Sequence, residues 1–291
     1  MKQKVSLVLG SGGAKGLAHI GVIEELEKQG FEISSISGSS IGSVYGGLYA
    51  MGKLSEYTKW VTTLDKLSIW DLMDFTISSN GLLKGEKVFS KMKTFIPDLL
   101  IENMDIPFTA VATDILNKKE VIFTSGSYYK AIRASVAIPT LITPVKFEDT
   151  FLVDGGVLNP VPIDYVKRIN GDILVVVNLY GEKDNVIENP IIKESDSQTF
   201  AYLNGFFKSI SKLISSGDKN SLGYFSLITA TTSAMVNKLA KHAIEKHQPD
   251  IVINIPHNSS NTFDFDKADK LIELGRKAAN KEISKYLNSK K

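Results

Sequence analysis

Two short apolar runs near the start of the chain each end in a glycine-rich turn that leads into a helical pattern. Residues 5–9 are apolar apart from Ser6, residues 10–16 are rich in glycine, and apolar residues then recur at helical spacing over residues 17–26. Residues 33–51 repeat the same order of strand, tight turn and helix. Two successive units of this kind predict a parallel sheet with helices on its faces, and therefore an α/β fold.

The rest of the chain extends this pattern within one domain. Because 43% of the 291 residues are hydrophobic, a sizeable core can form, and we predict a single domain over residues 1–291. Residues 53–97 have a helical and irregular pattern, a helix is expected at residues 127–136, and another begins near Asp266. Residues 182–248 are interpreted as a helical insertion or cap. Further strands are expected at residues 107–114, 120–124, 146–153, 172–179 and 250–255.

Charge and composition exclude several classes of protein. The chain has 34 basic and 32 acidic side chains, so its net charge of +2 gives no field that would attract nucleic acid. The absence of cysteine excludes disulfides, thiolate metal sites and a cysteine nucleophile. The first apolar run is too short for a signal peptide, and no stretch approaches the roughly 18 apolar residues of a membrane-spanning helix. We therefore expect a cytoplasmic protein, either soluble or peripheral to a membrane.

The second glycine turn, residues 38–42, has the sequence Gly-Ser-Ser-Ile-Gly and fits the G-x-S-x-G pattern of a nucleophile elbow. It stands where a strand should turn sharply into a helix, which is the context that the pattern requires. Small residues would let the backbone project the Ser40 hydroxyl above the carboxyl edge of the sheet. In the alternative interpretation, Ser40 is only the N-cap of a glycine-rich helix start.

The first glycine turn, residues 10–16, has three interpretations. A phosphate-binding P-loop would need Ser or Thr after Lys15, where the chain has Gly16, so this interpretation fails. A dinucleotide-binding turn would need glycine in place of Lys15 and an acidic residue after the second strand, so it is disfavoured. In the third interpretation, the N–H groups of Gly12 and Gly13 form an oxyanion hole beside Ser40. A cation at position 15 opposes the helix macrodipole, so Lys15 needs a role such as holding the loop or attracting an anionic head group.

Several residues are candidates for the group that accepts the proton of Ser40. Asp154 follows a predicted strand and precedes two glycines, and it is interpreted as either an ordinary Asp-Gly turn or the partner of Ser40. His257 follows the last strand and would complete a Ser-Asp-His order along the chain. His19 lies within the first helix and is interpreted as a packing residue. The two remaining histidines, His242 and His247, are expected to be solvated.

Taken together, these motifs resemble those of the patatin-like phospholipases, in particular the bacterial branch. The family pattern is a G-x-G-G-x-[RK]-G loop, a G-x-S-x-G elbow and a later D-G-[GA], matched here at residues 10–16, 38–42 and 154–156. Residues 81–86 and 134–139 also look like this branch, and the resemblance covers about residues 5–180. The basic position of the loop holds lysine where many members have arginine.

The resemblance implies a three-layer α/β/α fold with a mostly parallel central sheet. It also implies a Ser40–Asp154 dyad that acts without histidine, an oxyanion hole at Gly12 and Gly13, and hydrolysis of acyl esters in phospholipids or neutral lipids. The rest of the loop, Gly10, Lys15 and Gly16, would support the hole. No metal or cofactor is expected. A noncatalytic lipid-binding protein and a transacylase using the same dyad remain alternatives.

An amphipathic helix is expected inside the insertion. Its apolar face would either pack on the domain, or cover the acyl-binding cleft and contact a membrane peripherally. The apolar residues that recur at helical spacing are Phe200, Leu203, Phe206, Phe207, Ile210, Leu213 and Ile214.

Overall fold

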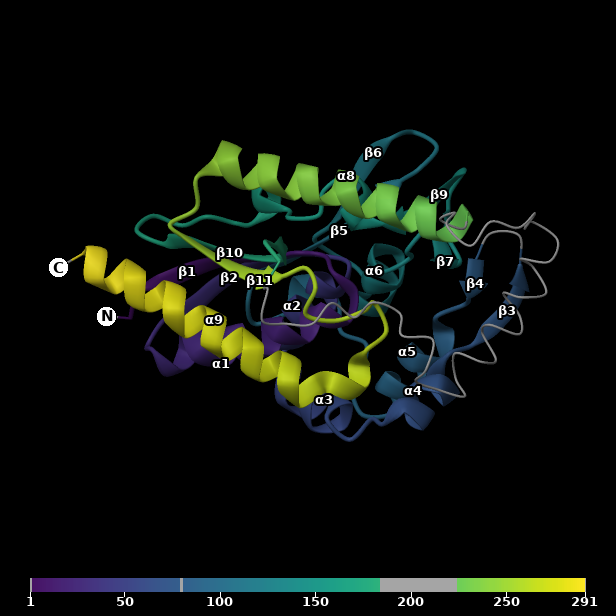
Figure 1. The fold of residues 1–291 in the computed structure, drawn as a ribbon, viewed down its shortest axis with the longest axis horizontal. Coiled ribbons are helices and arrows are strands. Elements are labelled where there is room, and N and C mark those ends of the chain that lie inside the picture. The colour runs from purple at the N-terminus through teal and green to yellow at the C-terminus, as the bar shows by residue number, and fades with distance from the viewer. Residues whose placement is uncertain (1, 79–80, 184–223, 291) are drawn as a thin grey trace.

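The computed structural model describes residues 2–78, 81–183 and 224–290 (Figure 1). Within these residues, the central sheet contains eight strands. The parallel part of the sheet has the order β11 (Ile251–Pro256), β10 (Ile173–Gly181), β1 (Lys4–Leu9), β2 (Glu32–Ser39) and β5 (Phe108–Asp114). The antiparallel part consists of β9 (Thr150–Asp154), β8 (Val145–Phe147) and β6 (Lys119–Phe123).

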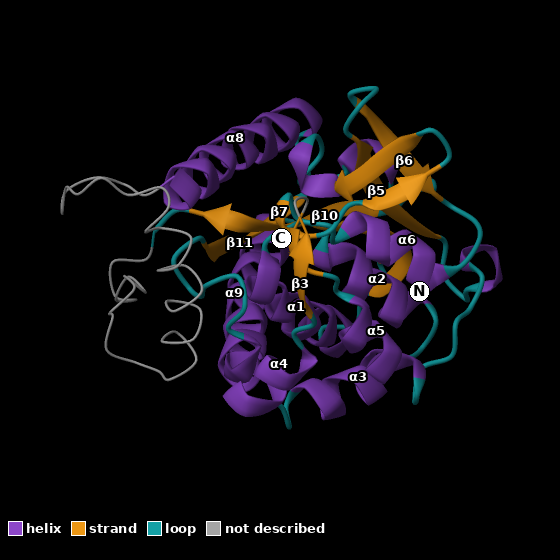
Figure 2. Cartoon of the chain, turned by 90° about the vertical axis from the view of Figure 1, so that its right-hand side faces the viewer, coloured by secondary structure: helices purple, strands orange, loops and turns teal. Residues whose placement is uncertain are grey.

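Helices cover both faces of this sheet, as Figures 1 and 2 show. The side chains of β1 alternate, so that Val5, Leu7 and Leu9 pack with the helices on one face while Val8 packs on the other. The first face carries α1 (Leu17–Lys28), α2 (Ile41–Ala50), α6 (Tyr128–Ser135) and α9 (Ala268–Ser289), and the second carries α8 (Tyr224–His247). The predicted three-layer fold is therefore confirmed. Strands buried on both sides read as continuous apolar runs, which is why residues 5–9 and 172–179 could be recognised in the sequence.

One edge of β5 brings two distant strands end to end. Residues 108–111 of β5 pair with the end of β2 in parallel, and residues 112–114 pair with β9 in antiparallel. Both partners occupy the same edge, because β6 pairs with residues 110–114 along the opposite edge. The carboxyl ends of β2 and β9 therefore meet head-on beside Val111 and Ala112.

The region between β2 and β5 contains more strand than the sequence predicted. After α2, its helices are α3 (Leu54–Val61), α4 (Lys66–Leu72) and α5 (Glu86–Lys93). The unpredicted strands β3 (Phe75–Ser78) and β4 (Gly81–Leu83) join β7 (Thr140–Ile142) in a second sheet. Strands of three or four residues give too short a pattern for recognition, and the pairing of β4 with β7 links segments far apart in the chain. Short 3-10 turns occur at Gly13–Gly16, Ile101–Asn103, Gly155–Val157, Ile163–Tyr165 and Phe265–Lys267.

The predicted insertion, residues 182–248, lies mostly outside the described residues. Its last part forms α8, which packs on the sheet through Ala240, Ala243 and Ile244. The expected amphipathic helix at residues 200–214 falls on residues that the structure does not describe, so the cap stays a prediction. Among the helices that the structure describes, none is long and apolar enough to cross a bilayer.

Candidate active site

Ser40 lies at the sharp turn between β2 and α2. Its backbone φ is 54°, in the left-handed region that residues with a side chain seldom adopt. A Cβ on Gly38 would lie 2.4 Å from the carbonyl oxygen of Gly42, and a Cβ on Gly42 would lie 2.1 Å from that of Leu9. Glycine at both positions therefore lets the backbone turn tightly around Ser40.

The hydroxyl of Ser40 does not cap the helix that it precedes. Ser40 occupies the N-cap position of α2, as the alternative interpretation expected, but its side chain makes no capping hydrogen bond. The Ser40 N–H instead donates to Ser135 Oγ at 2.9 Å, and Ser135 Oγ donates to the carbonyl oxygen of Val111 at 2.6 Å. Ser135, to which the sequence assigned no role, thus ties the turn to β5.

Asp154 ends β9 and meets Ser40 where β2 and β9 come together. Ser40 Oγ donates to Asp154 Oδ2 at 2.5 Å, and the N–H of Gly156 donates to Asp154 Oδ1 at 2.7 Å. Both side chains are buried, with 3% of Ser40 and 6% of Asp154 exposed. The structure therefore brings together two predicted site residues that are 114 positions apart in the chain.

Burial changes the acidity of Asp154. Loss of water around the carboxyl raises its pKa from 3.8 to about 7, against the opposing effect of the hydrogen bonds from Ser40 and Gly156. A carboxylate with this pKa is a far better proton acceptor near neutral pH than an exposed aspartate. A hydroxyl that donates a hydrogen bond to a carboxylate of raised pKa can pass its proton to that carboxylate.

Within the glycine loop, two backbone N–H groups stand out. The N–H groups of Gly10, Ser11 and Ala14 donate to the carbonyl oxygens of Val177, Pro160 and Thr262, respectively. Across the described part of the chain, the N–H groups of Gly12 and Gly13 have no hydrogen-bond acceptor. Gly13, whose φ is +61°, also lines the same cavity as Ser40. These two N–H groups are therefore available to an oxyanion.

His19 forms a hydrogen bond to this glycine loop. It is fully buried in α1, and its Nε2 lies 2.8 Å from the carbonyl oxygen of Gly10, so the ring donates this hydrogen bond. Burial lowers the pKa of His19 to about 4, which keeps the ring neutral. The packing interpretation of His19 captured its burial and missed this contact, because nothing in the local sequence pairs a helix residue with a carbonyl nine residues earlier.

His257, the predicted alternative base, makes a different contact. Its Nδ1 lies 3.0 Å from the carbonyl oxygen of Gly181, to which it donates. Of the other histidines, His242 is exposed and His247 lies beside Asp164. Among the residues that the structure describes, no histidine hydrogen-bonds to the Ser40–Asp154 pair.

An apolar cavity of about 170 Å³ opens beside Ser40. Its walls come from α2 to α5, the second sheet and the segment before α9, a combination that no sequence motif indicated. Six of its lining residues are Ile41, Val44, Ile69, Leu83, Phe89 and Ile138. A cavity with these apolar walls, which Ser40 also lines, suits a hydrocarbon chain attached to a reactive carbonyl.

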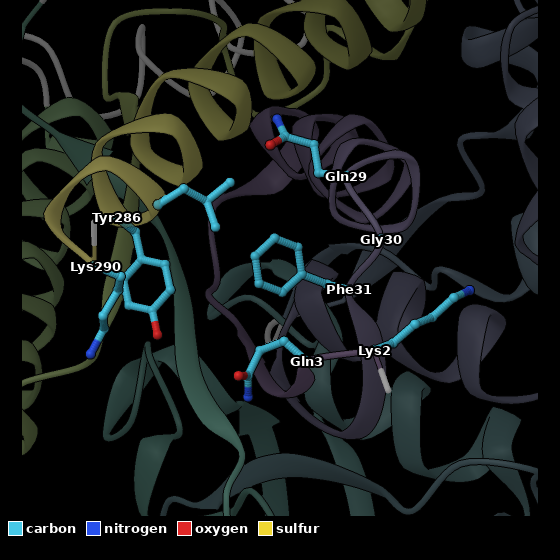
Figure 3. Close-up of a pocket in the computed structure, with 8 residues that line it drawn as sticks. Lys2, Gln3, Gln29, Gly30, Phe31, Tyr286 and Lys290 are labelled. Atoms are coloured by element: carbon cyan, nitrogen blue, oxygen red, sulfur yellow. The ribbon is translucent and has the colours of Figure 1, made fainter.

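A larger pocket of about 860 Å³ lies at the amino-terminal edge of the sheet, opposite the edge that carries Ser40 (Figure 3). Phe31 and Tyr286 lie on opposite sides of it, and lysines from both ends of the chain stand at its rim. None of its lining residues is a serine, a histidine or a carboxylate, so it lacks the groups of the Ser40–Asp154 pair. Its lining residues are Lys2, Gln3, Gln29, Gly30, Phe31, Tyr286, Leu287 and Lys290.

Comparisons with known proteins place these features in context. Residues 7–167 match the model of the family described as Patatin-like phospholipase. An uncharacterized NTE family protein of Mycobacterium tuberculosis is 30% identical, over 97% of this chain and 92% of that protein. Lysophospholipase NTE1 of Scheffersomyces stipitis is 26% identical, over 98% of this chain and 18% of that protein. The solved structure of VipD from Legionella pneumophila shares 13% identity at a TM-score of 0.47, over 98% of this chain and 67% of that one.

Proposed function

Because this chain belongs to the patatin-like phospholipase family, we propose that it is a lipid acyl hydrolase in which Ser40 is the nucleophile and Asp154 the general base. The observation that carries the proposal is the 2.5 Å contact between Ser40 Oγ and Asp154 Oδ2 beside an apolar cavity that Ser40 lines. The name of the lysophospholipase relative supports a phospholipid-derived ester as substrate.

The proposed reaction has two halves. Ser40 Oγ attacks the ester carbonyl carbon while its proton passes to Asp154 Oδ2, and the N–H groups of Gly12 and Gly13 stabilise the oxyanion. The carbonyl re-forms, the ester C–O bond breaks, and the departing alkoxide takes the proton from Asp154. Water then attacks the acyl-enzyme and gives a proton to Asp154. The fatty acid leaves as that proton returns to Ser40 Oγ.

This proposal is tested by labelling and by turnover. A lipid-like phosphonate that reacts with activated serines should modify Ser40, as mapped by peptide mass spectrometry. The same preparation should release fatty acid from lysophospholipid micelles and from a short soluble ester. Modification at a different serine, or hydrolysis of neither substrate, would refute the assignment.

Replacing His257 with alanine should leave most of the activity, within about threefold in kcat, because its ring bonds to the Gly181 carbonyl and not to the catalytic pair. Steady-state kinetics on the soluble ester provides the measurement, with His242→Ala as a matched control at an exposed position. A loss as large as that expected for removal of the nucleophile would assign the base to His257.

His19→Leu should lower kcat by roughly tenfold with little change in KM, because it leaves the buried Gly10 carbonyl unpaired and loosens the glycine loop. His19→Gln, whose amide can donate to the same carbonyl, should recover part of the loss. Kinetics measured alongside melting temperatures separates loop positioning from global destabilisation. Equal kcat values for the Leu and Gln variants would show that the hydrogen bond has no part in catalysis.

A further inference from the structure

An apolar ridge stands on the protein surface at α4 and the start of β3. Leu67 of α4 is 74% exposed, the largest fraction for a large hydrophobic residue in the described part of the chain. Trp70, three residues further along α4, is its neighbour on the same side of the helix. The Trp70 ring packs against that of Phe75, with 4.8 Å between the ring centroids, and Phe75 is 45% exposed. These three side chains form one continuous apolar surface, the α4–β3 ridge.

The other face of the same helix lines the apolar cavity. Ile69 and Leu72 of α4, and Met73 directly after it, belong to the cavity wall, as does Ser40. Ile69 is buried, whereas Leu72 and Met73 are half-buried, so on this side the cavity wall reaches the protein surface. One short helix thus separates the space proposed for an acyl chain from the exposed ridge. Both α4 and β3 lie at the right-hand end of the molecule in Figure 1.

Charged groups beside the ridge are largely compensated. Asp65 Oδ1 accepts hydrogen bonds from the N–H of Ser68 at 2.8 Å and from its hydroxyl at 2.7 Å, and Asp71 Oδ1 lies 2.9 Å from Lys87 Nζ. Lys66, at the start of α4, is exposed, and its long side chain can extend toward lipid headgroups. Tryptophan and large aliphatic side chains are favoured at the boundary between headgroups and acyl chains. The ridge therefore has the composition of a surface that inserts at this boundary.

We propose that the α4–β3 ridge is a membrane-docking surface, which inserts into the headgroup region and turns the accessible side of the cavity toward the bilayer. A lipid chain can then enter the cavity without crossing water. A bilayer is the occupant that fits, because the ridge adjoins the entry to the proposed lipid site and a second copy of the chain would cover that entry. This inference rests on the proposed hydrolase function, and it assigns membrane contact to described residues and not to the helix expected at residues 200–214.

Trp70 itself reports the docking. The chain has two tryptophans, and the other, Trp60, packs against Phe95 with 5.4 Å between the ring centroids. In the Trp60→Phe protein, vesicles of a diether phosphatidylcholine, which has no ester to hydrolyse, should shift the emission of Trp70 to the blue. Bromine atoms on the lipid chains should quench it. If Trp60→Phe does not fold, Trp70→Phe replaces it and should abolish the shift seen with the parent. Emission that vesicles leave unchanged would overturn the proposal.

Leu67→Asp should weaken binding to these vesicles by about tenfold or more in a flotation assay, because it places a charge on the ridge. Leu67 is not among the described residues that line the cavity, so kcat/KM on a short soluble ester should stay within about twofold of the parent value, while hydrolysis of vesicle-borne phospholipid falls with binding. Leu116→Asp is the matched control. Leu116 is 60% exposed in the turn between β5 and β6, on the side opposite α4 in Figures 1 and 2, and its replacement should leave vesicle binding unchanged.

The outcomes separate the docking surface from the proposed function. Parental vesicle binding by Leu67→Asp, or equal losses in Leu67→Asp and Leu116→Asp, would refute the surface and leave the hydrolase proposal intact. A change of oligomeric state in Leu67→Asp without a change in vesicle binding would assign the ridge to self-association and would also refute it. Docking through Trp70 by a protein that hydrolyses no ester would support the surface and refute the proposed function.

Discussion

Ser40→Ala is expected to abolish ester hydrolysis, with a fall in kcat of roughly 10⁴-fold or more, while the protein stays folded. The hydroxyl is the proposed nucleophile, so the variant has no Oγ at position 40 to form the acyl-enzyme. Among the described residues, the side chain of Ser40 hydrogen-bonds to Asp154, whose other oxygen keeps the N–H of Gly156. Alanine therefore removes the reaction without opening the turn, and the melting temperature should change little.

Ser39 offers a matched control for this variant. It stands next to Ser40 at the end of β2, is fully buried, and in the described part of the chain its Oγ has no hydrogen-bond partner. Ser39→Ala should therefore keep its activity and its labelling by phosphonate, whereas Ser40→Ala should lose both. Turnover by Ser40→Ala clearly above that of the buffer, or loss of labelling in Ser39→Ala alone, would rule out Ser40 as the nucleophile.

The parts of this molecule that the sequence predicted well are those with a local signal. The buried strands are continuous apolar runs, and the turns at residues 10–16 and 38–42 carry their glycines within a few positions of the groups that they shape. Close backbone approach, such as that of Gly42 to Leu9, excludes any larger side chain. A close backbone approach of this kind can be inferred from the glycines of a single sequence.

Features that depend on distant contacts could not be predicted from the residues alone. The head-on meeting of β2 and β9 along β5 determines the distance between Ser40 and Asp154, and no spacing in the chain encodes it. No sequence pattern indicates the hydrogen bond from His19 to the Gly10 carbonyl or the one from the Ser40 N–H to Ser135 Oγ. The apolar cavity depends on how short helices and strands pack together, so its existence and lining emerged only with the fold.

Asp154→Asn is expected to lower kcat by roughly 10²-fold or more. The amide has nearly the same shape and can still accept the hydrogen bond from Gly156, but it cannot take a proton from Ser40. In the parent protein, kcat/KM should rise with pH through an apparent pKa of about 7, because Asp154 must be ionised to act as base. Rate profiles from pH 5 to pH 9 provide the measurement. An Asn variant with near-parental turnover would return the role of the base to another group.

The same variant should become more stable relative to the parent as pH rises. The pKa of Asp154 is raised from 3.8 to about 7 on folding, so between these values the unfolded chain releases a proton that the folded protein keeps. The parent's free energy of unfolding therefore falls over this range, by on the order of 4 kcal/mol in all, whereas asparagine does not titrate. Because all other groups titrate alike in both proteins, the difference between their denaturant-unfolding free energies at pH 4 and pH 8 isolates Asp154. A difference that stays flat over this range would mean that Asp154 keeps an ordinary pKa, and Ser40 would then lack the buried base on which the proposed mechanism depends.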